Sequence, residues 1–155
     1  LLGVEIAKKL IGVKQSTGDL FTLPIILGMI IGRIGCFLSG VSEPTFGIET
    51  TLPWGMDLGD GLLRHPTSLY EIFFLATLGL LIHRSSQIFP RAGDAFKTFL
   101  IAYLIFRFFI DFIKPTEALA LGLTSIQLTC LAGIIYYSKS IFRMSRELFQ
   151  KKDIS

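Results

Sequence analysis

The sequence has little cysteine and little charge. It has only two cysteines in 155 residues, and charged residues make up 17%, against about 25% in soluble domains. Cys36 and Cys130 show neither CxxC nor metal-ligand spacing, so both are interpreted as structural thiols, and no metal site or cofactor is expected. A formal charge of +3 without a basic patch interleaved with aromatics argues against a nucleic-acid partner.

Apolar residues are abundant instead. They make up 51% of the chain, and the mean hydropathy is +0.61. The apolar runs are continuous, without the period-two alternation of a barrel strand, which favours helices. Four segments reach the length of a membrane span, and they are Leu20–Leu38, Pro66–His83, Phe96–Lys114 and Leu123–Phe142.

The predicted fold class is therefore an all-α membrane protein, a polytopic helical bundle of about four spanning helices in one transmembrane domain over residues 1–155. The chain opens with Leu1 inside what reads as the end of an apolar helix. We expect this to be the end of a fifth helix, and the chain to be the C-terminal fragment of a longer protein.

The connections between these segments alternate in charge. The first, Leu1–Asp19, is basic, and Ser39–Thr67 carries −3. Arg84–Lys97 carries +2, Pro115–Gly122 holds only the acid Glu117, and the tail, Lys139–Ser155, carries +3. By the positive-inside rule, both ends of the chain are predicted to be cytoplasmic and the Ser39–Thr67 loop to lie outside.

Two arginines interrupt the apolar segments. Arg33 lies five residues before the outer end of its predicted span, about 7–8 Å deep, and Arg107 lies seven residues before Lys114, about 10 Å deep. A charge at bilayer depth costs at least ~2.5–3.5 kcal/mol on insertion scales, and such residues commonly mark functional sites. The competing interpretation is a buried ion pair between helices.

Tyr103, Arg107 and Asp111 follow at helical spacing on one face. An ion pair between Arg107 and Asp111 would explain that charge without any ligand. Arg33 has no acidic neighbour in its own span, only glycines. A pair of arginines suits a phosphate, because each planar guanidinium binds its oxygens bidentately. The most abundant phosphate at that depth is a phospholipid head group.

A third polar motif opens the second span, where Arg64, His65 and Pro66 are followed by Tyr70 and Glu71. Pro66 suits the first turn of a helix, and an acid near its start favours the dipole. Taken alone, the motif is better explained as a capped interfacial helix with an aromatic anchor at Tyr70.

Together these motifs resemble the prolipoprotein diacylglyceryl transferase family, in order and spacing, from Leu2 to about Ile135. The resemblance is carried by Gly32-Arg33-Ile34-Gly35-Cys36-Phe37, Pro53-Trp54-Gly55, Arg64-His65-Pro66 with Leu69-Tyr70-Glu71, Tyr103 through Asp111, and Gly122-Leu123-Thr124 with Gln127.

The resemblance implies a multi-pass enzyme of the bacterial plasma membrane. It would transfer the diacylglyceryl group of phosphatidylglycerol to the lipobox cysteine of a prolipoprotein signal peptide and release glycerol phosphate. The residues it implies are catalytic Arg33, Arg107, His65 and Glu43, and substrate-binding Tyr103, Asp111, Glu71 and Gln127 together with the two arginines.

The chain departs from the family pattern at several positions. Cys36 stands where the family has Asn, Ser68 where it has Gln, and Val41 where it has Glu, so that role is given to Glu43 two residues later. The family's upstream helices, with a His-Gly-Gly segment, are not in this sequence.

Two further interpretations remain open. The first is a non-catalytic membrane subunit that binds an anionic phospholipid through the same arginines. The second is a transporter fragment, which the absence of inverted repeats and of broken helices in the sequence disfavours.

Overall fold

The structure is a computed structural model that describes residues 7, 10–12, 18–42, 45–85, 89, 91–116 and 122–152. Glu43, one of the predicted catalytic residues, lies outside these residues. The described elements are helices α2 (Gly18–Leu38), α3 (Thr67–Arg84), α4 (Asp94–Ile110) and α5 (Ser125–Lys152), 3₁₀ turns η1 (Gly40–Ser42) and η2 (Asp111–Ile113), and strands β1 (Met56–Asp57) and β2 (Leu63–Arg64).

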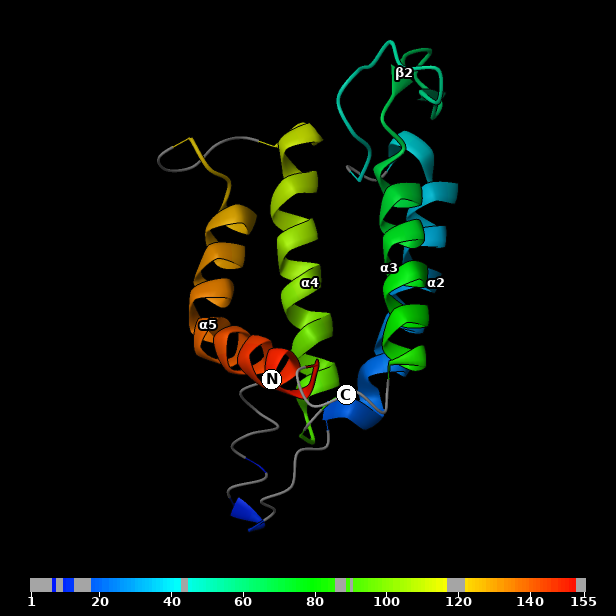
Figure 1. The fold of residues 1–155 in the computed structure, drawn as a ribbon. Coiled ribbons are helices and arrows are strands. Elements are labelled where there is room, and N and C mark those ends of the chain that lie inside the picture. The colour runs from blue at the N-terminus through cyan, green and yellow to red at the C-terminus, as the bar shows by residue number, and fades with distance from the viewer. Residues whose placement is uncertain are drawn as a thin grey trace.

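Each of the four predicted apolar segments is helical, with shifted ends. The third helix is shorter than predicted because α4 ends at Ile110 and the chain tightens into η2. The fourth is longer, since α5 continues past Phe142 to Lys152 through a basic, amphipathic sequence, and its second half bends away from the first (Figure 1). Among the described helices, α2 alone is long and apolar enough by itself to cross a membrane.

Helix α2 packs against α3 and α4, and α4 also contacts α3 and α5. Close approach depends on glycine at two points. A Cβ on Gly79 of α3 would lie 3.3 Å from Ile26 of α2, and one on Gly133 of α5 would lie 2.7 Å from Leu104 of α4. The apolar core is formed by Ile26, Leu75, Ile82, Ala95 and Phe99.

One end of the bundle is held by carboxylates. Asp19 of α2 accepts the backbone N–H of Gly93 at 2.5 Å and of Phe96 at 2.9 Å, and so caps the start of α4. The buried Asp94 pairs with Arg143 of α5 at 2.6 Å and with Lys97 at 3.5 Å. The starts of α2 and α4, the end of α3 and the second half of α5 thus share the lower end of the molecule in Figure 1.

The opposite end carries a β-hairpin that the all-α prediction missed. Strands β1 and β2 are antiparallel, with Met56 opposite Arg64 and Asp57 opposite Leu63. The Asp57 carboxylate accepts the N–H groups of Gly59 at 2.8 Å and Gly61 at 3.0 Å, and these hydrogen bonds lower the pKa of Asp57. Both glycines have positive φ, which explains their place in the turn.

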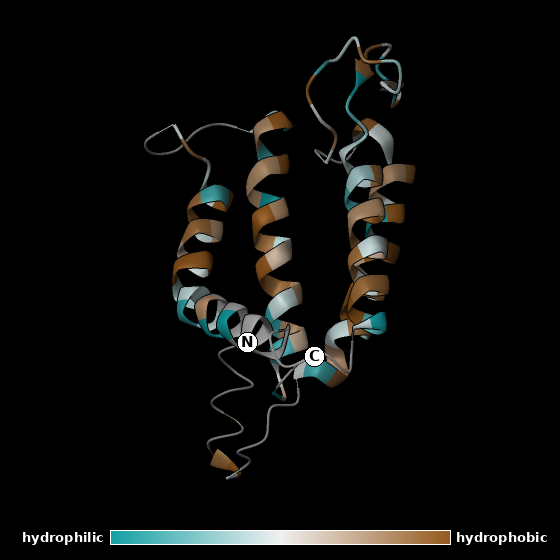
Figure 2. Ribbon diagram, in the orientation of Figure 1, coloured by the Kyte–Doolittle hydropathy of each residue, from teal (hydrophilic) through white to brown (hydrophobic). Residues whose placement is uncertain are grey.

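The distribution of buried and exposed residues is inverted relative to a soluble domain. Among the described residues, buried polar or charged side chains are as prominent as buried apolar ones. Large apolar side chains such as Leu20, Ile31, Phe73, Leu80 and Phe109 are exposed on the helices, and most of each helix ribbon has the colour of hydrophobic residues (Figure 2). Exposed apolar helix faces of this extent are expected where the surroundings are apolar too.

Candidate active site

The centre of the site is the carboxylate of Glu71. It projects from the second turn of α3 and is 1% exposed. Arg33 of α2 approaches its Oε1 through Nε at 2.8 Å, and Arg107 of α4 approaches its Oε2 through Nη1 at 3.6 Å. The two arginines, far apart in the sequence, therefore share one anion contributed by a third helix.

The two ion pairs are not equivalent. Nε of Arg33 lies within hydrogen-bonding distance of the carboxylate, whereas 3.6 Å is too long for a hydrogen bond from Arg107. Nη1 of Arg107 is in fact buried without a hydrogen-bond partner. A buried, unsatisfied guanidinium N–H is uncommon and leaves a donor that another acceptor can use.

Tyr103 completes the cluster. Its hydroxyl donates to Oε1 of Glu71 at 2.8 Å, and its ring stacks on Phe99 one turn earlier in α4. The stack of Phe74 on Phe106 at 4.2 Å holds α3 against α4 beside the charges. The helical spacing of Tyr103 and Arg107, recognised in the sequence, is therefore what brings both groups to the same carboxylate.

Asp111 lies nearby but forms no ion pair with either arginine. The Thr124 hydroxyl donates to Oδ2 of Asp111, and the Gln127 side-chain oxygen accepts the Thr124 N–H at 3.0 Å. The Arg107–Asp111 pair, the alternative considered from the sequence, is absent from the ion pairs of the described residues, where Arg107 meets Glu71. The reason is local, because α4 gives way to η2 at Asp111 and the four-residue helical spacing no longer applies.

Gln127, predicted to bind substrate, is instead 1% exposed and joins the start of α5 to the end of α4. Its amide nitrogen donates to the Phe108 carbonyl at 3.4 Å, and its backbone N–H donates to Thr124 at 3.1 Å. These contacts give Gln127 and Thr124 a clear part in positioning η2.

His65 lies where the loop enters α3. Its ring Nδ1 is 3.1 Å from the Tyr70 hydroxyl, and its backbone is hydrogen-bonded to Gly47 and Ile48. Its ring thus contacts Tyr70 and not the Glu71 carboxylate. Cys36 does adjoin the cluster, since its sulfur is 3.8 Å from Nη1 of Arg33.

One residue of this region, Lys114, was not among the predicted site residues, and in the sequence it marks only the end of a predicted span. Lys114 follows η2, is 8% exposed, and interacts electrostatically with Arg33, Arg107, Glu71 and Asp111. It forms no side-chain hydrogen bond or ion pair with any residue that the structure describes. The signal was its place three residues after Asp111, the next turn of the same polar series.

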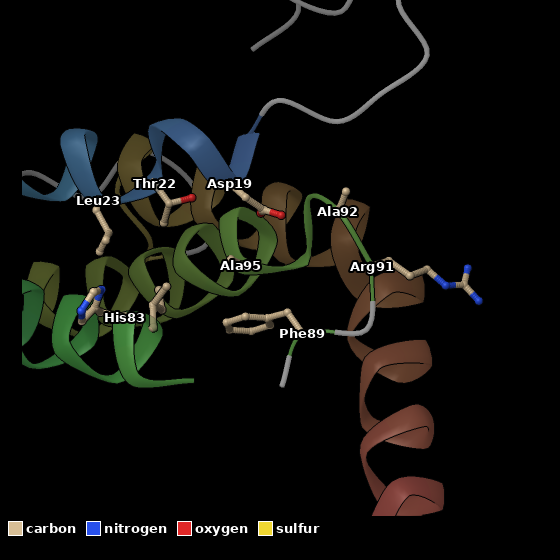
Figure 3. A pocket seen from close by; sticks show the side chains of 9 residues that line it. Asp19, Thr22, Leu23, His83, Phe89, Arg91, Ala92 and Ala95 are labelled. Carbon is tan, nitrogen blue, oxygen red and sulfur yellow. The ribbon is translucent and has the colours of Figure 1, made fainter. Parts of the chain in front are cut away.

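An apolar groove and a second cavity lie in different parts of the helix bundle. An apolar groove of about 560 Å³ runs along α3 and α4 and is lined by Leu69, Tyr70, Phe73, Phe74, Thr77 and Phe106. The second cavity, of about 310 Å³, lies at the other end of the bundle beside Asp19, Thr22 and Ala95 (Figure 3). The groove is lined by neighbours in sequence of Glu71 and Arg107, and its apolar walls suit a hydrocarbon chain.

The family model for prolipoprotein diacylglyceryl transferase matches residues 6–143. Curated relatives match most of the chain. A phosphatidylglycerol–prolipoprotein diacylglyceryl transferase of Wolbachia pipientis (strain wPip) is 32% identical over 150 residues, covering 86% of this chain and 56% of the relative. One of Nitratidesulfovibrio vulgaris (strain DP4) is 35% identical over 151 residues, covering 87% and 55%.

A third relative, the phosphatidylglycerol–prolipoprotein diacylglyceryl transferase of Bordetella parapertussis, is 36% identical over 128 residues, covering 76% of this chain and 47% of the relative. The chain thus spans about half the length of the curated relatives it matches. No solved structure matches it. The agreement over residues 6–143 establishes that the chain belongs to the prolipoprotein diacylglyceryl transferase family.

Proposed function

We propose that this chain forms the phosphate-handling part of a bacterial inner-membrane enzyme that transfers diacylglyceryl from phosphatidylglycerol to the lipobox cysteine of a prolipoprotein. The observation that carries the proposal is the convergence of Arg33 and Arg107 on one buried carboxylate. Membership of the family supplies the reaction, because the relatives carry the name of that transferase.

In this reaction the cysteine thiolate attacks a glycerol carbon of the lipid and forms a thioether. The carbon–oxygen bond to the phosphate breaks, and its electron pair leaves with glycerol phosphate. Negative charge therefore grows on the departing phosphate. Two fixed guanidiniums in a poorly solvated site stabilise that charge without reorganising, which lowers the barrier.

The site residues divide into three groups, which bind the phosphate, hold the guanidiniums, and support the end of α4. Arg33 and Arg107 would bind the phosphate, and the unsatisfied Nη1 of Arg107 is the donor ready to do so. Glu71 and Tyr103 would hold the guanidiniums at a fixed separation. Asp111 and Gln127 support the end of α4, so we assign them to positioning rather than to direct substrate contact.

A base is also needed, because a free thiol with a pKa near 8.5 is mostly protonated at neutral pH. The sequence offered His65 and Glu43 for this role. His65 lies at the entry of α3 against Tyr70, and Glu43 precedes it in the loop outside the described residues. We retain both residues as candidates for the base and expect the variant His65→Gln to separate them.

We also propose that α2, α3, α4 and α5 all cross the membrane as one domain, with both ends of this chain in the cytoplasm. Two observations support this topology. The connections alternate in charge, and the basic second half of α5 shares one end of the bundle with the starts of α2 and α4 (Figure 1). The site then lies towards the outer leaflet, near the hairpin.

The test is transfer of labelled diacylglyceryl from phosphatidylglycerol to a lipobox peptide, measured on the longest natural chain that carries these residues. Arg33→Lys and Arg107→Lys should each reduce transfer by about 10²–10³-fold, as loss of a transition-state donor does. Lysine keeps the charge but loses the planar fork.

Arg143→Lys is the matched control, because Arg143 pairs with Asp94 at the other end of the bundle. It should transfer normally. Near-normal transfer by either site variant, with lipid still bound, would refute catalysis and favour a subunit that only binds anionic phospholipid.

A further inference from the structure

Five formal charges gather around the proposed phosphate site. Arg33 and Arg107 pair with Glu71, and Asp111 and Lys114 follow at the end of α4, where the Asp111 N–H donates to the Arg107 carbonyl and the Lys114 N–H donates to the Asp111 carbonyl at 3.2 Å. The two arginines and Lys114 are cationic, and Glu71 and Asp111 are anionic. Three positive and two negative charges leave +1 among the described residues of this cluster. Arg64, the cation at the base of the hairpin, is matched by Asp60 at 2.7 Å and adds no net charge.

These charges act on one another strongly because they are poorly solvated. Glu71 and Asp111 are each 1% exposed, and Lys114 is 8% exposed. The side chains of Arg33 and Arg107 are 20% and 15% exposed. Charges in such a poorly solvated site interact several-fold more strongly than they do in water, and salt screens buried pairs little. The net charge of the cluster therefore affects which anion it can hold.

The reaction converts an anion of one charge into an anion of nearly two. The phosphodiester of a phospholipid carries −1, whereas a phosphomonoester such as glycerol phosphate carries about −1.5 to −2 at neutral pH. A cluster of +1 is neutralised by the diester and over-neutralised by the monoester. Without the Glu71 carboxylate the cluster would carry +2 and would match the product instead.

Resting on the proposed function, we infer that Glu71 is a specificity-determining residue that sets the site to one net positive charge, so that it retains a phosphodiester lipid and expels the phosphomonoester product. Glu71 acts through the arginines it contacts, and so it is a positioning residue rather than a group that touches the reacting atoms. Its two roles are compatible, since the same carboxylate fixes the guanidiniums and offsets one of their charges.

The experiment compares two soluble inhibitors of the transfer reaction. Glycerol phosphate is the monoester, and glycerophosphoglycerol is the diester with the head group of phosphatidylglycerol. Glu71→Gln preserves the shape and removes the charge. It should lower the inhibition constant of glycerol phosphate at least about 10-fold, change that of the diester much less, and reduce kcat through slow product release.

Lys114→Gln removes a positive charge and should act in the opposite sense, raising the inhibition constant of glycerol phosphate more than that of the diester. It also keeps the inference testable should Glu71→Gln fail to fold. Asp94→Asn is the control, because it removes a buried carboxylate at the other end of the bundle. It should leave the ratio of the two constants unchanged.

The outcomes separate the two proposals. If the wild-type protein transfers diacylglyceryl but Glu71→Gln weakens both inhibitors or leaves their ratio unaltered, Glu71 has only a structural role and the inference is overturned. A ratio that Lys114→Gln leaves unchanged would overturn it as well. A wild-type protein with no transfer at all would refute the proposed function, and the inference with it.

Discussion

Two of the buried carboxylates among the described residues form ion pairs, one at each end of the bundle. Glu71 lies between Arg33 and Arg107, and Asp94 lies between Arg143 and Lys97. Both carboxylates are almost fully buried, at 1% and 0% exposure. The cations of Asp94, however, are 32% and 30% exposed, about twice as much as those of Glu71.

The difference in exposure of the cations distinguishes a structural ion pair at Asp94 from the proposed phosphate site at Glu71. Asp94 begins α4, and the cations that meet it extend from the more accessible end of the bundle. They can reach water if the pair is lost. Arg33 and Arg107 instead lie well inside α2 and α4, whose other charges are confined to the first turn, so losing an anion leaves the two arginines few alternatives.

The most decisive test of this comparison is to determine which side of the membrane each cluster faces. If the Glu71 cluster faces the outside and the Asp94 cluster the cytoplasm, a cysteine at Asp60 should react only with an impermeant thiol reagent added outside. A cysteine at Lys139 should react only from within, and both changes belong in a background without Cys36 and Cys130. Labelling of Asp60→Cys solely from the cytoplasm would invert the proposed topology.

Removing one arginine from each cluster should separate activity from stability. Arg107→Met should reduce transfer by about 10²–10³-fold. Arg143→Met should leave transfer intact and lower the free energy of unfolding by about 1–2 kcal/mol, a modest value because Arg143 is partly solvated. Transfer rates and unfolding in detergent measure the two effects. Equal losses of activity in both variants would mean that the clusters have the same role.

His65→Gln should have a smaller effect. A general base contributes typically 10²–10⁴-fold, but the ring of His65 contacts Tyr70 at the entry of α3. We expect transfer to fall by less than about 10-fold, with folding unchanged. A decrease of 10²-fold or more, together with loss of the acidic limb of the pH–rate profile, would make His65 the base and leave Glu43 without that role.

The smallest effect is expected in the hairpin. The lowered pKa of Asp57 means that its ionised form stabilises the turn at pH values above the ordinary aspartate pKa near 4, and that this contribution is lost as the pH falls through the lowered folded-state value. Asp57→Ala should therefore speed exchange of the Gly59 and Gly61 amides at pH 6. The wild type should approach the variant on acidification, and an unchanged difference at low pH would contradict this account.

Much of this arrangement could be predicted from the sequence. Charges that interrupt apolar runs identified Arg33 and Arg107, and helical spacing placed Tyr103 beside Arg107. The sequence also singled out Glu71, but it could not show that both arginines share it. That contact depends on how three helices pack, which the spacing within one helix does not determine.

The errors have local causes. The Arg107–Asp111 pairing failed because the helix ends at Ile110, and no glycine or proline marks that end. The hairpin was missed because β1 and β2 are only two residues each, too short for alternation to be detected. Its turn, Asp57-Leu58-Gly59-Asp60-Gly61, nevertheless has the composition of a tight turn.

The cap that Asp19 provides has a consequence for biogenesis. It joins residues 74 and 77 positions apart, from the start of α2 to the start of α4. A ribosome must therefore add the whole α2–α3 unit before the partner amides exist, and until then this carboxylate remains without them. The first turn of α4 is in turn complete only when a helix made much earlier is already in place. These two hydrogen bonds can therefore form only after α2 and α3 have been synthesised. A chain that lacked α2 would begin α4 with these amide groups uncapped.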